Sequence, residues 1–527
     1  MTIISEKIND KSNNKKEKNN SNLQKLFFFS TIAFVVLLIA FFPIIHTLDA
    51  DGYFILREGR NVVESGIQYT NTGFIIPGTA TVVQQWLWAA GVFMVQSMSG
   101  DFGVKTLLLT IYLIDNILFY QIARCKGCNS FYSGIFTIIF SLFMFTFINI
   151  RPTLITVMFL MFEIGILDEF QITKDEFKMW TLPVIMFLIS IGLINIHAAL
   201  WPMVLVFMLP YVVPPMFTKI FPFEKKEKDR FDKKKKLILL VTVIAVIAGG
   251  FINPYGIEGM MYLYNSYNPM LNSLGIRELA SPSMTGYTGI LLMISMLVCA
   301  YYTFLWKAYH RTVPAYAAYL LAGCLIMTIL HQKNLFLVAF AFPMFMAEIF
   351  AGRKDRTIEK LKTNKKAGII AVIIETVCVL CLIVPAVQTA YPETERDLVP
   401  VQAVAWLDDH VNDLYKPTTK IYTDFNTGAY VEYKGYKGFM DARPELYFKS
   451  INKKADYIKD YQRFSVSKKD YESVMNKYKF DYLIVYPETK LDTYLQNDEK
   501  AELVDKSSSN KLYKYRWSDS SGSVEHV

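Results

Sequence analysis

Cysteine is scarce in this chain, with 6 residues in 527, and none follows Cys381. Cys125 and Cys128 form a single CxxC pair in a short predicted turn. A redox or metal role would require a second pair or an alternating strand–helix context. Neither His197 nor His331 has a partner at the HxxxH spacing typical of zinc ligands. We therefore expect neither a redox centre nor a zinc site.

Apolar residues, in contrast, are abundant: 53% of the chain is hydrophobic and 15% aromatic. This composition is typical of a polytopic membrane protein and not of a soluble enzyme. The first apolar run, Leu26–Ile45, follows a lysine-rich stretch and lacks an Ala-x-Ala-like cleavage site, which predicts a retained first helix. A mainly α-helical bundle of about eleven spans is expected. The further predicted spans are 102–123, 130–150, 153–170, 180–197, 199–221, 237–252, 287–306, 313–330, 334–351 and 367–388.

Basic residues decide the topology of the segment Thr81–Met98, which is apolar enough to be a span. If it lies along the membrane interface, anchored by Trp86 and Trp88, most lysine and arginine falls in loops on one side. The positive-inside tendency then places the N-terminal tail 1–25 in the cytoplasm and the C-terminal residues outside. The net charge of +8 follows from these loops, so no nucleic-acid partner is expected. The opposite loops hold few cations: Arg57, Arg60, Arg151, Arg277 and Lys333.

The polar motifs of the membrane half collect at the loop ends predicted to face outside. They mix acids, bases, histidine and asparagine with turn residues, whereas the predicted cytoplasmic loops are simple charged runs. This asymmetry indicates chemistry on a lipid-borne substrate at the outer mouth of the bundle. The motifs are Asp49-Ala50-Asp51, Arg151-Pro152-Thr153, Asn195-Ile196-His197, Asn253-Pro254-Tyr255-Gly256, Glu278-Leu279-Ala280-Ser281-Pro282 and His331-Gln332-Lys333-Asn334.

Asp49 and Asp51 are the candidate catalytic residues. Two carboxylates at i and i+2 on an extended loop can share a divalent cation such as Mg²⁺ or Mn²⁺ that bridges a phosphate. Alternatively, one of them can accept a proton from an attacking hydroxyl. A structural alternative is that Asp51 caps the predicted helix Gly52–Glu64. Because of their location we favour catalysis.

Cations beside the spans are candidate ligands for a lipid phosphate, Lys333 as a point charge and Arg151 as a bidentate donor. Snorkelling to the interface is the alternative explanation. Arg57 is a third candidate, although on its helix it could simply be solvated. His197 is expected to be a hydrogen-bonded interface residue and not a base. The residues that could contact substrate are His197, Asn195, Asn253, Tyr255, Glu278 and His331.

In order and sidedness these motifs resemble the GT-C superfamily of membrane glycosyltransferases, especially multi-spanning bacterial proteins near the protein mannosyltransferase-like branch. The segment DADGYFILREGR (49–60) is similar to the family's first outer loop, with Ile55 where a histidine is usual. Other matches are to short family motifs. These are Gln85-Trp86-Leu87, Arg151-Pro152-Thr153 for Arg-Pro-Gln, Asn195-Ile196-His197 for Asn-x-His, Asn253-Pro254-Tyr255-Gly256 for Asn-Pro-x-Gly, Lys333-Asn334 for Arg-Asn, and Asp441-Ala442-Arg443 with Tyr447 for Asp-Gly-Arg…Tyr.

The resemblance implies a polyprenyl-phosphate-linked sugar donor and inverting transfer to an extracytoplasmic glycan, lipid or protein. It also implies Asp51 as general base, Asp49 as helper or metal ligand, and Lys333 and Arg151 at the donor phosphate. A rival class is a transporter, flippase or assembly factor for envelope lipids. Three acids within predicted spans leave a proton path open: Asp115, Glu163 and Glu375.

The chain changes to a soluble character from Tyr391 onward. Helical spacing over 401–411 and 468–478 alternates with predicted strands at 420–424, 438–441 and 480–486. This alternation predicts a small extracytoplasmic α/β domain over 391–517, followed by a flexible tail, 518–527. Asp441 and Arg443 are expected to form a structural pair at a strand end.

Overall fold

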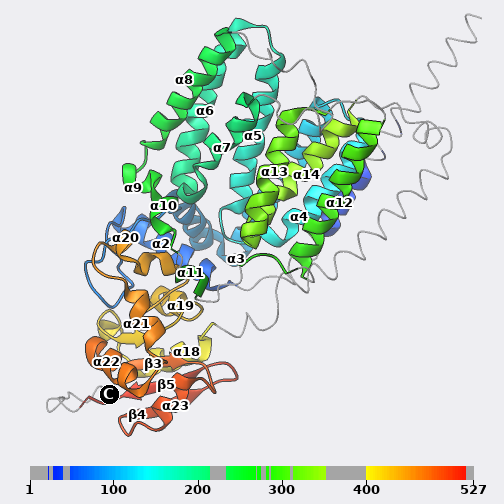
Figure 1. The fold of residues 1–527 in the computed structure, drawn as a ribbon. Helices are drawn as coiled ribbons and strands as arrows, with labels where there is room; N and C mark the ends of the chain where they lie inside the picture. Colours follow the sequence, from blue (N-terminus) through cyan, green and yellow to red (C-terminus); the bar gives the residue numbers. More distant parts are fainter. Residues whose placement is uncertain are drawn as a thin grey trace, which may run out of the picture.

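The protein consists of a helical bundle and a smaller sheet-containing domain beneath one end of it (Figure 1). The computed structural model describes residues 28–38, 48–213, 233–268, 270–273, 280–283, 286–308, 313–351 and 399–517, with positions 22 and 26. Several predictions lie outside these residues. They are the two terminal tails, the domain boundary at 391, the last predicted span, Glu278 and Glu375.

Apolar runs of the sequence form the helices of the bundle. Every span predicted between 102 and 351 corresponds to a helix. Among the described residues five helices are long and apolar enough to cross a membrane, so the chain is a multi-pass membrane protein, but eleven spans are not confirmed. Besides α3, the apolar helices of the bundle include Phe28–Leu38, α4 (Ser130–Met144), α5 (Thr153–Ile172), α6 (Glu176–Ile196), α7 (Met203–Val212), α8 (Lys233–Gly250), α12 (Tyr287–Ala308), α13 (Ala315–Leu330) and α14 (Leu335–Phe350).

Helix α3 (Trp86–Cys125) is broken at Gly100, whose φ of 61° few other residues adopt without strain. The break lies between the predicted interfacial segment and the predicted span 102–123, and the interfacial placement itself stays a prediction. The first part of α3 packs against α2 (Ala50–Ser65). A Cβ at Gly59 would collide with the carbonyl of Ala89, so a glycine permits this close helix contact.

The C-terminal domain contains a five-stranded sheet in the order β2-β1-β3-β5-β4. The strands β2, β1 and β3 are parallel to one another, and β5 is antiparallel to both of its neighbours, β3 and β4. The predicted strands and helices are present, but the β4–β5 hairpin was not predicted. The strands are β1 (Lys420–Tyr422), β2 (Lys437–Gly438), β3 (Tyr482–Val485), β4 (Ala501–Lys506) and β5 (Lys511–Tyr515), and the helices include α18 (Val401–His410), α19 (Gly428–Tyr433), α20 (Lys449–Asn452), α21 (Tyr457–Arg463), α22 (Lys468–Tyr478) and α23 (Lys490–Gln496).

The loop between α2 and α3 joins the two parts of the molecule. Its backbone extends the sheet at β2, because Gly438 N donates to Gly73 O at 2.9 Å and Ile75 N donates to Gly438 O at 3.1 Å. Between these residues, Phe74 is 3% exposed and packs edge-on against two tyrosines of the domain. The domain is therefore held against the end of the bundle at which Asp49 and Asp51 lie.

Candidate functional site at the bundle–domain junction

Asp49 and Asp51 lie at the start of α2 and meet the same cation. Asp49 Oδ1 accepts a hydrogen bond of 2.7 Å from Gly52 N and thus caps the helix. The structural alternative, in which Asp51 caps the helix, is wrong, because α2 begins at Ala50, two residues before the expected start at Gly52, and its N-cap is Asp49. Asp51 forms an ion pair with Arg151, whose Nη2 lies 3.7 Å from Asp49 Oδ2. The Asp51 side chain is 15% exposed and that of Asp49 42%.

Arg151 is positioned by a turn that leads into α5. Asn149 Oδ1 accepts from Arg151 N at 3.1 Å, and Trp88 Nε1 donates to Ile150 O at 2.6 Å. The turn is therefore tied to the first part of α3, which also supports α2. With 30% of its side chain exposed, Arg151 faces both the acidic pair and solvent.

His197 ends α6 close to this turn. Thr156 Oγ1 lies 2.7 Å from Pro152 O and 2.9 Å from His197 Nδ1. A hydroxyl has one proton to donate. If Thr156 donates it to Pro152, then His197 must donate from Nδ1. Burial, followed by the charges of Arg443 and Lys333, lowers the pKa of His197 to about 3. His197 is thus hydrogen-bonded, as its position at the end of a span predicted, and burial disfavours its charged form.

Arg443 approaches the site from the C-terminal domain. Its guanidinium lies 5.5 Å from the Phe54 ring centroid, and its Nε is 3.7 Å from Glu445 Oε1. Burial lowers the pKa of Arg443, but Glu445 and other acids including Asp51 raise it above its usual value. Arg443 was predicted to form a structural pair with Asp441, and its backbone N does donate to Asp441 Oδ1 at 2.8 Å. Its electrostatic interaction with Asp51 was not predicted, because residues 51 and 443 are far apart in the sequence.

Arg57, a predicted phosphate ligand, is buried in the junction and is only 2% exposed. It forms ion pairs with Glu58 and Glu432, and its Nη2 lies 3.8 Å from Asp441 Oδ2. The alternative of a solvated Arg57 was therefore wrong. Burial raises the pKa of Asp441 to about 6, although Arg57 opposes this shift. This group of four charged residues holds the domain to α2.

Asn195 and Asn253 make structural hydrogen bonds beside the site. Asn195 accepts from Trp86 Nε1 at 2.9 Å and donates to Ile252 O at 2.7 Å. Asn253 organises its own turn, with Nδ2 donating to Gly250 O at 2.7 Å and Oδ1 accepting from Tyr255 N at 2.8 Å. The Tyr255 hydroxyl donates to Gln68 O at 2.9 Å. These three predicted contact residues thus fasten loops to one another.

Lys333 and His331 lie between α13 and α14, on the 3-10 turn Gln332–Asn334 and at its N-cap. Lys333 is exposed and His331 half-buried. The turn is anchored by Gln332 N, which donates to Ala280 O at 3.0 Å. The charge of Lys333 reaches His197, so Lys333 belongs to the same end of the bundle as Arg151.

The residues present fit a divalent cation poorly. Asp49 and Asp51 both direct an oxygen at Arg151, and His197 Nδ1 is engaged by Thr156. Across the described ranges, no group of three or more histidine, cysteine, aspartate or glutamate side chains could hold a metal ion. The cation between the two carboxylates is the guanidinium.

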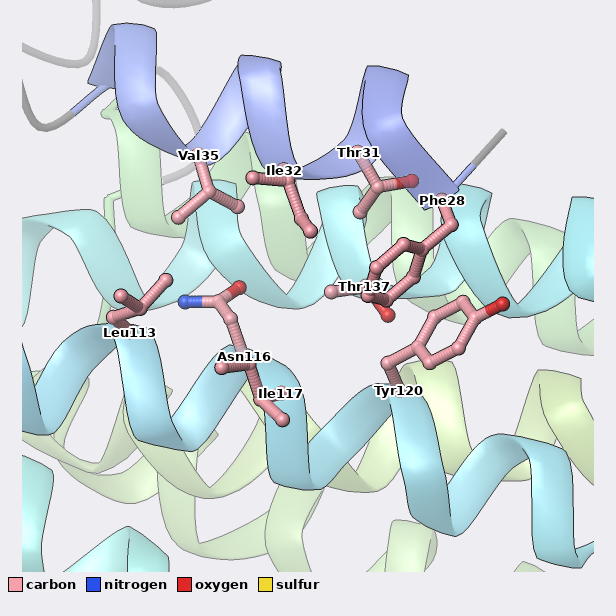
Figure 2. A pocket seen from close by; sticks show the side chains of 9 residues that line it. All are labelled: Phe28, Thr31, Ile32, Val35, Leu113, Asn116, Ile117, Tyr120 and Thr137. Carbon is pink, nitrogen blue, oxygen red and sulfur yellow. The ribbon is translucent and has the colours of Figure 1, made fainter. Parts of the chain in front are cut away.

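A separate, shallow hollow lies among the apolar helices (Figure 2). It is formed by Phe28–Leu38, α3 and α4, and Asn116 and Thr137 are among the few polar side chains in it. The Asn116 side chain points toward the Phe28–Leu38 helix (Figure 2). None of the predicted site residues lines this hollow, so we place the candidate site at the junction.

No protein-family model and no curated protein matches this sequence. Solved structures do match. Archaeal oligosaccharyltransferase AglB from Archaeoglobus fulgidus, in complex with an inhibitory peptide and a dolichol-phosphate, superposes with a TM-score of 0.60 and 10% identity, over 86% of this chain and 69% of that one. The Archaeoglobus fulgidus oligosaccharyltransferase tethered with an acceptor peptide gives 0.52 and 9%, over 92% and 74%. The fold of this chain is therefore similar to the fold of these oligosaccharyltransferase structures.

Proposed function

We propose that this protein is an integral-membrane glycosyltransferase that moves a sugar from a polyprenyl-phosphate donor to an extracytoplasmic acceptor. The observation that carries the proposal is the acid–guanidinium centre formed by Asp51 and Arg151 at the bundle–domain junction. A carboxylate can accept the proton of an attacking hydroxyl, and a guanidinium can bind the phosphate leaving group. The fold supports it, because the neighbouring structure binds a dolichol-phosphate.

Asp51 is the proposed general base. The acceptor hydroxyl oxygen forms a bond to the anomeric carbon while the bond from that carbon to the phosphate oxygen breaks. The hydroxyl proton goes to Asp51, the polyprenyl phosphate leaves with the bonding electrons, and the anomeric configuration inverts. General-base catalysis typically contributes about 10²–10⁴-fold to the rate.

Arg151 is the proposed ligand of the departing phosphate. A guanidinium has five N–H donors in a planar fork, so it can contact Asp51 and a phosphate oxygen together. Lys333 would add a second positive charge from the exposed turn at the same end. We assign Arg57 to the junction and not to the phosphate, because carboxylates already surround it.

Two isosteric variants test the proposal: Asp51→Asn and Asp49→Asn. Sugar release and transfer are measured with purified protein and a panel of polyprenyl-phosphate sugars. Asp51→Asn should lower kcat by about a hundredfold or more. Asp49→Asn should stay close to wild type, because asparagine caps helices as well as aspartate does. Equal activity of wild type and Asp51→Asn would move the base elsewhere.

A transporter of envelope lipids is the second candidate. Asp115 in α3 and Glu163 in α5 are each 0% exposed within apolar helices, and their carboxyl oxygens have no hydrogen-bond partner among the described residues. Buried carboxyls of this kind occur in proton relays. Lipid movement in vesicles that is lost in Glu163→Gln, together with no sugar transfer from any donor, would favour this function.

A further inference from the structure

The acidic pair, Asp49 and Asp51, lies against a positively charged side chain of the same protein. Arg151 forms an ion pair with Asp51, and its Nη2 lies 3.7 Å from Asp49 Oδ2. We infer that the Arg151 guanidinium takes the place of a divalent metal at this site, so that Asp49 and Asp51 bind no metal ion and the transfer is metal-independent. This inference rests on the proposed function and specifies the cofactor requirement of the same site.

The count of available ligands supports it. Mg²⁺ takes six oxygen ligands, and proteins hold it by one or two carboxylates while water and substrate phosphate supply the others. Asp49 Oδ1 is used as the helix cap by Gly52 N, and one oxygen of each carboxylate faces Arg151. A metal would have to displace the guanidinium and recruit further ligands. The described residues supply no third carboxylate or imidazole for such a group.

The surrounding charge supports it as well. Arg443 interacts electrostatically with both Asp51 and Arg151. This further positive side chain disfavours a dication at the acidic pair and favours a phosphate anion. Unlike a metal, an arginine contributes this charge without binding an additional component.

The inference predicts that removal of Arg151 creates a metal site. Mn²⁺ binding to the purified full-length protein is measured by electron paramagnetic resonance for wild type, Arg151→Met, Arg151→Lys and Arg151→Met/Asp51→Asn. Wild type should show no Mn²⁺ binding that depends on Asp51. Arg151→Met should bind Mn²⁺ at least about tenfold more tightly, whereas Arg151→Lys keeps the positive charge and should not. The double variant should lose the gain.

Other carboxylates can bind Mn²⁺ weakly, so the quantity to compare is the Mn²⁺ binding that is lost when Asp51 is replaced by asparagine. Mn²⁺ binding by wild type that disappears in Asp51→Asn would overturn the inference. An unchanged Mn²⁺ affinity in Arg151→Met would also overturn it, provided that the variant unfolds at the same temperature as wild type. In the activity assay, transfer should stay within about twofold when EDTA replaces Mn²⁺. Because binding is measured without turnover, an inactive protein would reject the proposed function and leave the metal result standing.

Discussion

Two arginines of this protein meet carboxylates in different settings, and exposure separates their roles. Arg57 is 2% exposed and lies among Glu58, Glu432 and Asp441. The Arg151 side chain is 30% exposed beside Asp51. A fully buried guanidinium can only hold its neighbours in place, whereas a partly exposed one can also meet a ligand. We therefore expect stability to depend on Arg57 and phosphate binding on Arg151.

Replacing Arg57 with methionine should destabilise the protein by about 3–5 kcal/mol, because it leaves buried carboxylates without their cation. Thermal unfolding of the purified protein measures the effect. Arg60→Met is the matched control on the same helix, since among the described residues the Arg60 guanidinium donates to the Tyr433 carbonyl and lies over its ring, with no carboxylate partner. Equal losses in the two variants would show that the carboxylate cluster is not what holds the domain.

His197 predicts a pH dependence of stability. Its folded-state pKa of about 3 lies below the unfolded value of about 6.5. Between these values the unfolded chain binds the extra proton, so this residue makes the protein less stable as pH falls below 6.5. From pH 7.5 to 5 the loss should be about 2 kcal/mol.

The measurement is the fall in Tm between these pH values, compared between wild type and His197→Gln. The variant should lose less. Asp441, whose pKa is raised to about 6, acts in the opposite direction between its unfolded value and pH 6. The difference between variant and wild type is therefore the quantity to examine. A fall of equal size in both proteins would contradict a buried, neutral His197.

At the level of elements, the contact between α2 and the first part of α3 sets the position of Asp49 and Asp51. Gly59 permits it, because any side chain there would collide with the backbone of Ala89. Since α2 also packs on α19 of the C-terminal domain, a shift of α2 would alter the distance from Asp51 to Arg151. The helix pair is thus a scaffold for the site.

Gly59→Ala should therefore cost about 1–3 kcal/mol of stability through overpacking and should lower transfer activity as well. Gly91→Ala is the matched control, since nothing lies within 4 Å of a Cβ at that position of α3. Alanine suits a helix interior better than glycine by about 1 kcal/mol, so the control should unfold at the same or a higher temperature. Thermal unfolding and sugar transfer of both variants provide the check. A stable, active Gly59→Ala would show that the helices can separate without cost.

Across the whole molecule, clusters of buried ion pairs lie at both ends of the bundle, around Arg57 and around Lys126. At the end away from the C-terminal domain, Lys126 forms ion pairs with Asp168 of α5 and Glu348 of α14. Tyr211 of α7 donates to Asp168 at 3.0 Å, and Tyr316 of α13 donates to Glu348. The helices α5, α7, α13 and α14 therefore converge on one lysine at the end of α3.

Lys126→Met should lower stability by about 3–5 kcal/mol, because it leaves two largely buried carboxylates without a cation. Lys178→Met removes an exposed pair, with Glu169 at 3.8 Å, and should cost at most about 1 kcal/mol. The comparison uses thermal unfolding, with sugar transfer measured at low temperature to show that the distant site still works. If Lys126→Met loses no more stability than Lys178→Met, then the Lys126 cluster does not stabilise the packing of these helices.

The sequence was sufficient for those features that depend on neighbours along the chain. Apolar runs placed the helices between 102 and 351, and strand and helix spacing predicted α18, α22 and β3. Sequence order also singled out Asp49, Asp51 and Arg151, because loop ends that share a membrane side can be counted from the spans. The charged, weakly patterned β4 was missed, since only its pairing with β5 makes it a strand.

The tertiary structure was needed wherever partners are far apart in the chain. The sequence shows Arg57 only as a charged residue on a helix, whereas in the structure it lies against Glu432 and Asp441. Arg443 interacts electrostatically with Asp51, which lies almost 400 positions earlier in the chain. The contact of Asp49 and Asp51 with Arg151 likewise joins residues about 100 positions apart and is visible only in the structure. Hydrophobic burial is encoded residue by residue, but an ion pair depends on which charges the packed helices and the sheet bring together.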